Sequence, residues 1–149
     1  MAPAFVAPYR KSGKNDGNDA EAICEAVTRP TMRFVPVKSM EQQSILAVHR
    51  ARQGFVKART AQANQIRGLL AEFGLVVPQG LWNVCQRVPA LLERAADAVP
   101  LALRHLIERL LVHLRELDRQ VGELESQIQA WHRSSEMSRR LEKIPGVGP

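Results

Sequence analysis

Aromatic side chains are scarce in this chain of 149 residues, at 5% of the total. The sequence therefore does not predict a single hydrophobic core. Long stretches instead have the pattern of amphipathic helices. Only two cysteines are present, Cys24 and Cys85, and neither has a partner at the spacing of a metal site. This argues against a disulfide-stapled scaffold and indicates reduced thiols in the cytoplasm.

Long hydrophobic runs are also lacking. No stretch approaches the roughly 18 apolar residues that a membrane helix needs, and no secretory signal pattern opens the chain. We therefore expect a cytoplasmic protein without a membrane partner.

Acidic residues are missing from one long segment. The net charge is +6, and residues 42–71 contain no Asp or Glu. Residues 99–133, in contrast, balance five arginines with five acids. The cationic excess is thus concentrated in one segment, which favours a polyanion as partner. Its five basic residues are Arg50, Arg52, Lys57, Arg59 and Arg67.

The first third of the chain divides into three pieces. Residues 1–10 are broken by prolines and read as extended. A helix is predicted from about Asp16 to Thr28, because the residue before Pro30 avoids helical geometry. Residues 31–38 read as an extended connector and mark a domain boundary.

A long helix capped by Ser39 follows, and its expected seam has a polar middle. Steps of three and four lead from Ile45 to Phe73 and place Arg52, Arg59 and Gln62 where a dry seam needs apolar side chains. The arginines either snorkel beside a loose seam or keep the seam open for phosphates. Arg50 and Lys57 lie on the opposite side of this helix.

Residues 75–100 form a break that contains four turn-favouring residues: Pro78, Gly80, Pro89 and Pro100. A short helix is expected from Pro89 to Ala98, because proline fits the first turn. Trp82 is expected to be a packed anchor, and stacking on a base is the alternative.

The third long helix, about Leu101 to Arg133, has the most regular apolar pattern. A seam stepping 3,4,3,4,3,4,3 specifies a left-handed coiled coil. Its partner is either the second helix of the same chain or the same helix of a second copy. Because the second helix has a polar middle, we expect a homodimer contact for at least part of the seam, with His105 and His113 facing solvent. The seam residues are Ile107, Leu110, Leu114, Leu117, Val121, Leu124, Ile128 and Trp131.

Two carboxylates stand at the start of the first helix. Asp16 and Asp19 are three residues apart, so a helix that begins there places them on one side. They are either acids at the positive end of the helix dipole, with Asn15 or Asp16 as the cap, or ligands of a hard divalent cation.

Two segments resemble one family of bacterial transposases. Residues 8–23, with Lys-Asn-Asp-x-Asn-Asp-Ala-Glu-Ala, and residues 59–74, with Asn64, Arg67, Glu72 and Gly74, match its patterns. The family comprises RNA-guided insertion-sequence recombinases with a RuvC-like DEDD domain followed by a catalytic-serine domain. The resemblance implies that Asp16 and Asp19 are the last two acids of the DEDD set and bind Mg²⁺.

The resemblance also implies an internal fragment. In the family the first Asp and the Glu lie upstream of this stretch, and the catalytic serine lies downstream. Residues 1–38 would be the end of the DEDD domain, 39–133 a stalk with a helix that contacts guide RNA, and 134–149 the truncated start of the serine domain. The final Pro-Gly-Val-Gly resembles the hairpin of a helix-hairpin-helix, whose backbone N–H groups face phosphate.

The predicted fold class is mostly α: a remnant of a RuvC-like α/β domain, then long coiled-coil helices and a truncated helix-hairpin-helix start. The predicted function is a fragment of a DNA transposase that binds DNA and guide RNA and is inactive alone. The alternatives are a stand-alone nucleic-acid-binding dimer without catalysis and a purely structural coiled coil, and the segregation of charge counts against the second. The residues expected to contact nucleic acid are Lys11, Lys14, Arg50, Arg52, Lys57, Arg59, Asn64, Arg67, Gly146 and Gly148.

Overall fold

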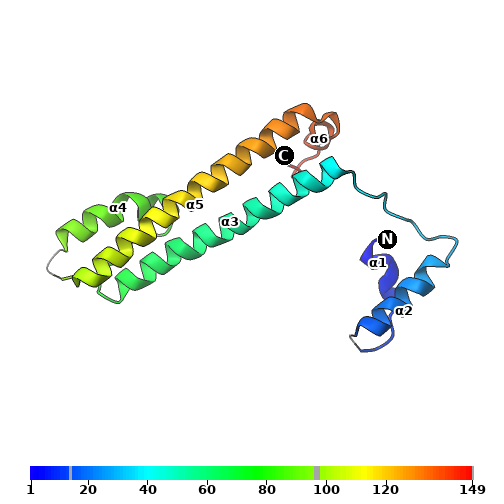
Figure 1. Ribbon diagram of the computed structural model, residues 1–149, viewed down its shortest axis with the longest axis horizontal. Helices are drawn as coiled ribbons and strands as arrows, with labels where there is room; N and C mark the ends of the chain where they lie inside the picture. Colours follow the sequence, from blue (N-terminus) through cyan, green and yellow to red (C-terminus); the bar gives the residue numbers. More distant parts are fainter. Residues whose placement is uncertain (14, 96–97, 149) are drawn as a thin grey trace. The chain divides into compact units, whose positions relative to one another are not determined.

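The computed structural model describes residues 1–13, 15–95 and 98–148, and these residues form helices and connecting loops with no strand. The mostly α prediction is confirmed. The chain forms two compact units, Met1–Ser39 and Met40–Pro149. In the described part of the chain, no helix is both long and apolar enough to cross a membrane. Figure 1 shows the elements: α1 (Pro3–Val6), the 3-10 helix η1 (Ala7–Tyr9), α2 (Asp16–Val27), α3 (Met40–Ala71), α4 (Leu81–Arg94), α5 (Leu101–Ser134) and α6 (Glu136–Leu141).

The start of the first unit differs from its prediction. Residues 1–10 were expected to be extended, but α1 and η1 are helical. Each of these short helices has a proline in its first turn, where a missing N–H and a fixed φ favour helix entry. A strand would also need a neighbour for its backbone hydrogen bonds, and the described residues supply none.

Helix α2 begins and ends as the sequence indicates. Asn15 caps it, with its side-chain oxygen accepting a hydrogen bond from the Asn18 N–H at 2.7 Å. Helix α2 and the segment before it are joined by the Arg29 guanidinium, which lies 5.3 Å from the centre of the Tyr9 ring. Only Ala22 and Ala26 are buried in α2, so this unit has little apolar core.

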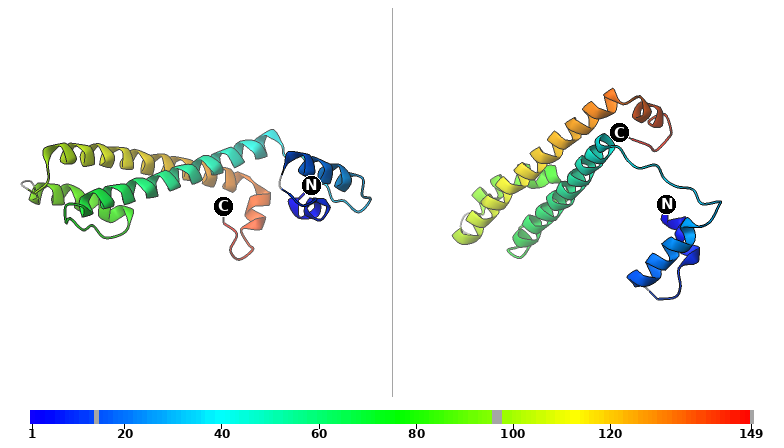
Figure 2. Two further views of the ribbon diagram at one scale, coloured as in Figure 1. Left: turned by 90° about the horizontal axis from the view of Figure 1, so that it is seen from below. Right: turned by 45° about the vertical axis from the view of Figure 1, so that its right-hand side comes forward.

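The second unit is built on an antiparallel hairpin of α3 and α5. These two helices form the most extensive helix–helix contact of the chain and lie side by side in Figures 1 and 2. The predicted helix over 101–133 is confirmed as Leu101–Ser134. Its seam is buried against the same chain, including Ile107 and Leu114 at 0% exposure. The fully buried side chains of the unit are Ile66, Leu70, Val84, Val88, Ile107 and Leu114.

The seam of α5 thus packs against α3 of the same chain. Because α3 has a polar middle, the sequence had instead predicted a contact between α5 and a second copy. Helix α5 instead carries matching polar groups. The Gln62 side chain is buried, and its Oε1 lies 2.8 Å from Nδ1 of His113. His113 is itself exposed, as predicted, so it meets Gln62 from the solvent side of the seam. At the other end of the hairpin, Trp131 Nε1 donates to Glu41 Oε1 at 3.1 Å. The seam of α5 is thus covered by α3 of the same chain. A homodimer through this seam stays a prediction.

Two further predictions, both about the region of helix α4, differ from the structure. The helix expected over 89–98 instead spans Leu81–Arg94, with Pro89 inside it; the predicted stretch also includes residues 96 and 97, which lie outside the described residues. Gly80, with φ of +106°, starts the helix early, and Val84, Val88 and Leu92 bury its apolar face. Trp82 is 66% exposed, so the expectation of a packed anchor is wrong.

Candidate nucleic-acid interface

The outer face of α3, which we define as Arg50, Gly54, Lys57, Ala61, Asn64 and Gly68, points away from α5. These residues follow one another in steps of four and three, so they form one line along the helix. All six are exposed. Space beside the two glycines is open, since a side chain at Gly54 or Gly68 would meet no atom within 4 Å. The face is therefore smooth, and its cations can be approached closely.

The other arginines of the predicted set are engaged inside the hairpin. Arg52 donates to Glu125 of α5, with Nε at 3.0 Å, and Arg59 donates to Asp118. These ion pairs are partly exposed, and they join the two long helices at positions where the α3 seam is polar. Of the two interpretations of these arginines, the geometry favours the structural one.

Arg67 holds a loop in place. Its Nε donates to the Val77 carbonyl at 2.9 Å, and its guanidinium also reaches the Asn64 side chain at 3.3 Å. The loop follows Gly74, whose φ of +75° ends the helix as the sequence indicates. Arg67 thus shapes the end of α3 while remaining half-buried.

A shallow groove connects these residues to α4. It has a volume of about 270 Å³ and is lined by Arg59, Asn64, Arg67, Gly80 and Leu81, among others. Three of the residues predicted to contact nucleic acid therefore share one concave surface, although each of them already has a protein partner.

The exposed face of α5 has a different electrostatic character. Arg119 bonds to two acids of its own helix, with Nε donating to Glu116 at 2.8 Å and another nitrogen donating to Glu123. The hydrogen bonds that Glu116 accepts from Arg119 and Gln120 lower its pKa to about 2. Arg119 is thus neutralised within its own helix, whereas the segment that forms α3 offers no acid between residues 42 and 71.

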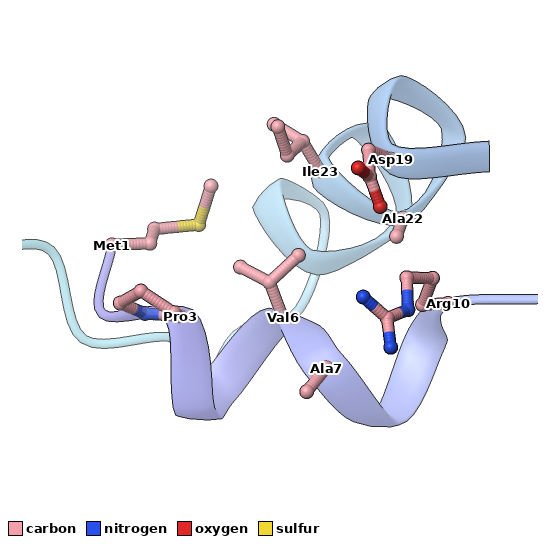
Figure 3. Close-up of a pocket in the computed structure, with 8 residues that line it drawn as sticks. All are labelled: Met1, Pro3, Val6, Ala7, Arg10, Asp19, Ala22 and Ile23. Atoms are coloured by element: carbon pink, nitrogen blue, oxygen red, sulfur yellow. The ribbon is translucent and has the colours of Figure 1, made fainter. Parts of the chain in front are cut away.

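Asp16 and Asp19 lie in the first turn of α2, as predicted. Asp16 is exposed and Asp19 is half-buried at the edge of an apolar pocket of about 470 Å³. Figure 3 shows the Asp19 carboxylate and the Arg10 guanidinium on the same side of this pocket, with Val6 and Ile23 on its apolar side. The pocket lies wholly within the first unit.

The two carboxylates fit part of a Mg²⁺ site. Carboxylate oxygens a turn apart are suitable ligands, but among the described residues no group of three His, Cys, Asp or Glu side chains could hold a metal. The Lys11 ammonium pairs with Glu21 at 2.5 Å, and its contact with nucleic acid stays a prediction. Lys14 lies outside the described residues.

The terminal hairpin retains its predicted turn. Gly146 has φ of +85°, and no atom lies within 4 Å of the space beside Gly146 or Gly148. The Val147 N–H bonds back to the Ile144 carbonyl at 3.0 Å. Both glycines are exposed, so backbone approach to them is unhindered by the described residues.

Sequence reasoning missed several cations that the fold gathers. Arg87 and Arg94, seven residues apart on α4, line a groove of about 420 Å³ beside the exposed Val76. A second group lies where α5 turns into α6. The seven-residue spacing was a usable signal for the first group, but the second depends on a chain reversal that the pattern does not reveal.

Comparisons with known proteins point to one class of protein. A family model for DEDD-type transposases of IS110 elements, described as transposase, matches residues 2–74. The chain is 43% identical, over its whole length, to a protein of Pseudomonas aeruginosa named "Probable family 20 transposase", covering 44% of that protein. It is 39% identical, over 99% of its length, to the transposase for insertion sequence element IS1111A of Coxiella burnetii, covering 41% of it.

The family model and these relatives together support an insertion-sequence transposase. The chain spans less than half the length of these two curated relatives. No solved structure matches it at a significant level.

Proposed function

We propose that this chain is the part of an insertion-sequence transposase that contacts nucleic acid through the outer face of α3. The observation that carries the proposal is an acid-free helix whose exposed cations, Arg50 and Lys57, have no acidic partner among the described residues. Asn64 continues the same line and adds an amide that can bond to sugar or phosphate oxygens. In the whole protein this contact serves DNA transposition, with guide RNA as the ligand that the family resemblance favours.

Salt-dependent binding tests this proposal. The full chain is titrated with a labelled single-stranded RNA and, separately, with a duplex DNA at several salt concentrations. Each phosphate contact contributes a slope of roughly −0.7 to −0.9 in log K against log salt, so two exposed cations predict at least about −1.5. Tighter binding of the RNA supports the guide-RNA assignment. Binding that is absent or independent of salt would overturn the interface itself.

We further propose that Asp16 and Asp19 hold Mg²⁺ together with ligands from elsewhere in the whole transposase. The ion would supply Lewis-acid stabilisation of a reacting phosphate, and the two carboxylates of this chain would position it. Because they are only part of a ligand set, the 149 residues alone should bind Mg²⁺ weakly and should not cut DNA. Mg²⁺-dependent cleavage by the chain, lost in Asp16→Asn and kept in the control Glu25→Gln, would show that the chain is active alone.

A further inference from the structure

The corner between α5 and α6 forms a concave surface rich in cations. Its cavity has a volume of about 680 Å³ and lies where the chain reverses after Ser134. The charged side chains that line it are Arg133, Arg139, Arg140, Lys143, Glu136 and Glu142. Four cations therefore face two acids in one small volume.

Both acids are already engaged. Glu136 accepts a hydrogen bond from Arg140 at 2.6 Å, and Glu142 lies 3.2 Å from Nε2 of His132. Arg133, Arg139 and Lys143 have no acidic partner among the described residues. A cluster of like charges that lacks counter-charges repels itself and is stabilised by a bound anion.

His132 holds the corner in shape. It is 9% exposed, and its Nδ1 lies 2.8 Å from the Ser138 hydroxyl. A neutral ring with its proton on Nε2 satisfies both partners, since Ser138 then donates to Nδ1 and Nε2 donates to Glu142. Ser135 caps α6 by accepting from the Ser138 N–H. These bonds fix the cavity before any ligand arrives, which lowers the ordering cost of binding.

We propose that this cavity binds a backbone phosphate of a nucleic acid. A guanidinium presents two parallel N–H donors that match phosphate oxygens, and an ammonium adds a point charge. The exposed turn at Gly146 follows directly after the cavity residues, so a strand seated there can continue along the hairpin backbone. The anion site stands on its own residues, whereas its assignment to a nucleic acid rests on the proposed function.

Nuclear magnetic resonance of the His132 ring tests the site directly. The full chain is titrated with inorganic phosphate and, in a second series, with a short single-stranded RNA. His132 lines the cavity, so its ring signals should move and saturate in both series. The double variant Arg139→Gln/Lys143→Gln should abolish this movement and flatten the salt slope of RNA binding by about 1.5. The matched control, Arg50→Gln/Lys57→Gln, removes two charges from α3 and should leave the movement of the His132 signals with phosphate unchanged.

The outcomes separate the two proposals. Signals that move with RNA but not with inorganic phosphate still support the site, because they show that a phosphate of the RNA backbone binds in the cavity. Signals that move with phosphate alone overturn the assignment to nucleic acid, and signals that move with neither ligand overturn the site. Loss of RNA binding in the α3 variant has no bearing on the cavity, and an unaffected α3 variant beside an impaired corner variant would refute only the α3 interface.

Discussion

The exposed faces of α3 and α5 belong to one hairpin but carry charge in opposite ways. Along α5, Arg119 is bonded to Glu116 and Glu123 of its own helix. Along α3, Arg50 and Lys57 stand beside glycine, alanine and glutamine and are exposed. Local pairing neutralises Arg119 within α5, whereas the unpaired cations on α3 favour a polyanion. A similar number of arginines thus indicates different roles, and the partner of each side chain decides which role it has.

The largest expected effect comes from disrupting the seam that holds the two faces in place. Leu114 is completely buried between α3 and α5. Leu114→Ala should lower the free energy of unfolding by about 2–5 kcal/mol, because it removes a buried side chain and leaves a cavity. Urea denaturation measures this loss. Leu106→Ala is the matched control on the same helix; Leu106 is 42% exposed, so the control should cost less than about 1 kcal/mol. Equal losses would contradict the observed packing.

An ion pair between the helices gives a smaller effect. Arg59 bonds to Asp118 across the seam, with both side chains partly exposed. A double-mutant cycle with Arg59→Gln and Asp118→Asn should give a coupling free energy of about 0.2–1 kcal/mol, the usual range for exposed pairs. Additive effects of the two substitutions would mean that Arg59 is not held by α5 in solution, which would return it to the candidate phosphate contacts.

The paired face of α5 can be examined by acid titration. The pKa of Glu116 is lowered to about 2 in the folded chain by hydrogen bonds from Arg119 and Gln120. Because a lowered pKa favours the ionised form, this contribution to stability is present above the ordinary pKa and is lost as the pH falls towards 2. A carboxyl titration by nuclear magnetic resonance should show the low midpoint, and Arg119→Gln should move it upwards. A Glu116 midpoint that is the same in the Arg119→Gln variant would refute the pairing of Glu116 with Arg119.

The two cysteines provide the smallest test. Cys24 is exposed, whereas Cys85 is half-buried, and burial raises the pKa of its thiol. Iodoacetamide at neutral pH should therefore modify Cys24 first, as peptide mass spectrometry can follow. Faster modification of Cys85 would mean that α4 opens away from the hairpin.

The sequence predicts the long helices well because their signals are local. The seam of α5 repeats without interruption, and Asn15 and Gly74 mark helix ends by their own chemistry. The partner of that seam was harder to predict. The polar middle of α3 argued for a second copy, because periodicity does not show that Glu125, Asp118 and His113 lie opposite Arg52, Arg59 and Gln62.

The candidate interface shows the same limit. Charge counting identified the acid-free segment, and helical spacing placed Arg50 and Lys57 away from the seam. It left the role of Arg52 and Arg59 open, since the acids that pair with them lie 73 and 59 residues away in the chain. The cavity at the α5–α6 corner was not predicted for a related reason: the bonds of His132 to Ser138 and Glu142 form only after the chain reverses.

The division of the α3 cations is tested most directly by comparing two double variants in RNA binding. Arg50→Gln/Lys57→Gln removes the exposed pair, and Arg52→Gln/Arg59→Gln removes the pair bonded to α5. The first should flatten the slope of log K against log salt by about 1.5 and leave the urea midpoint unchanged. The second should lower the urea midpoint and keep the slope. The reverse pattern, with the slope lost only in the second variant, would contradict the outer face of α3 as the interface.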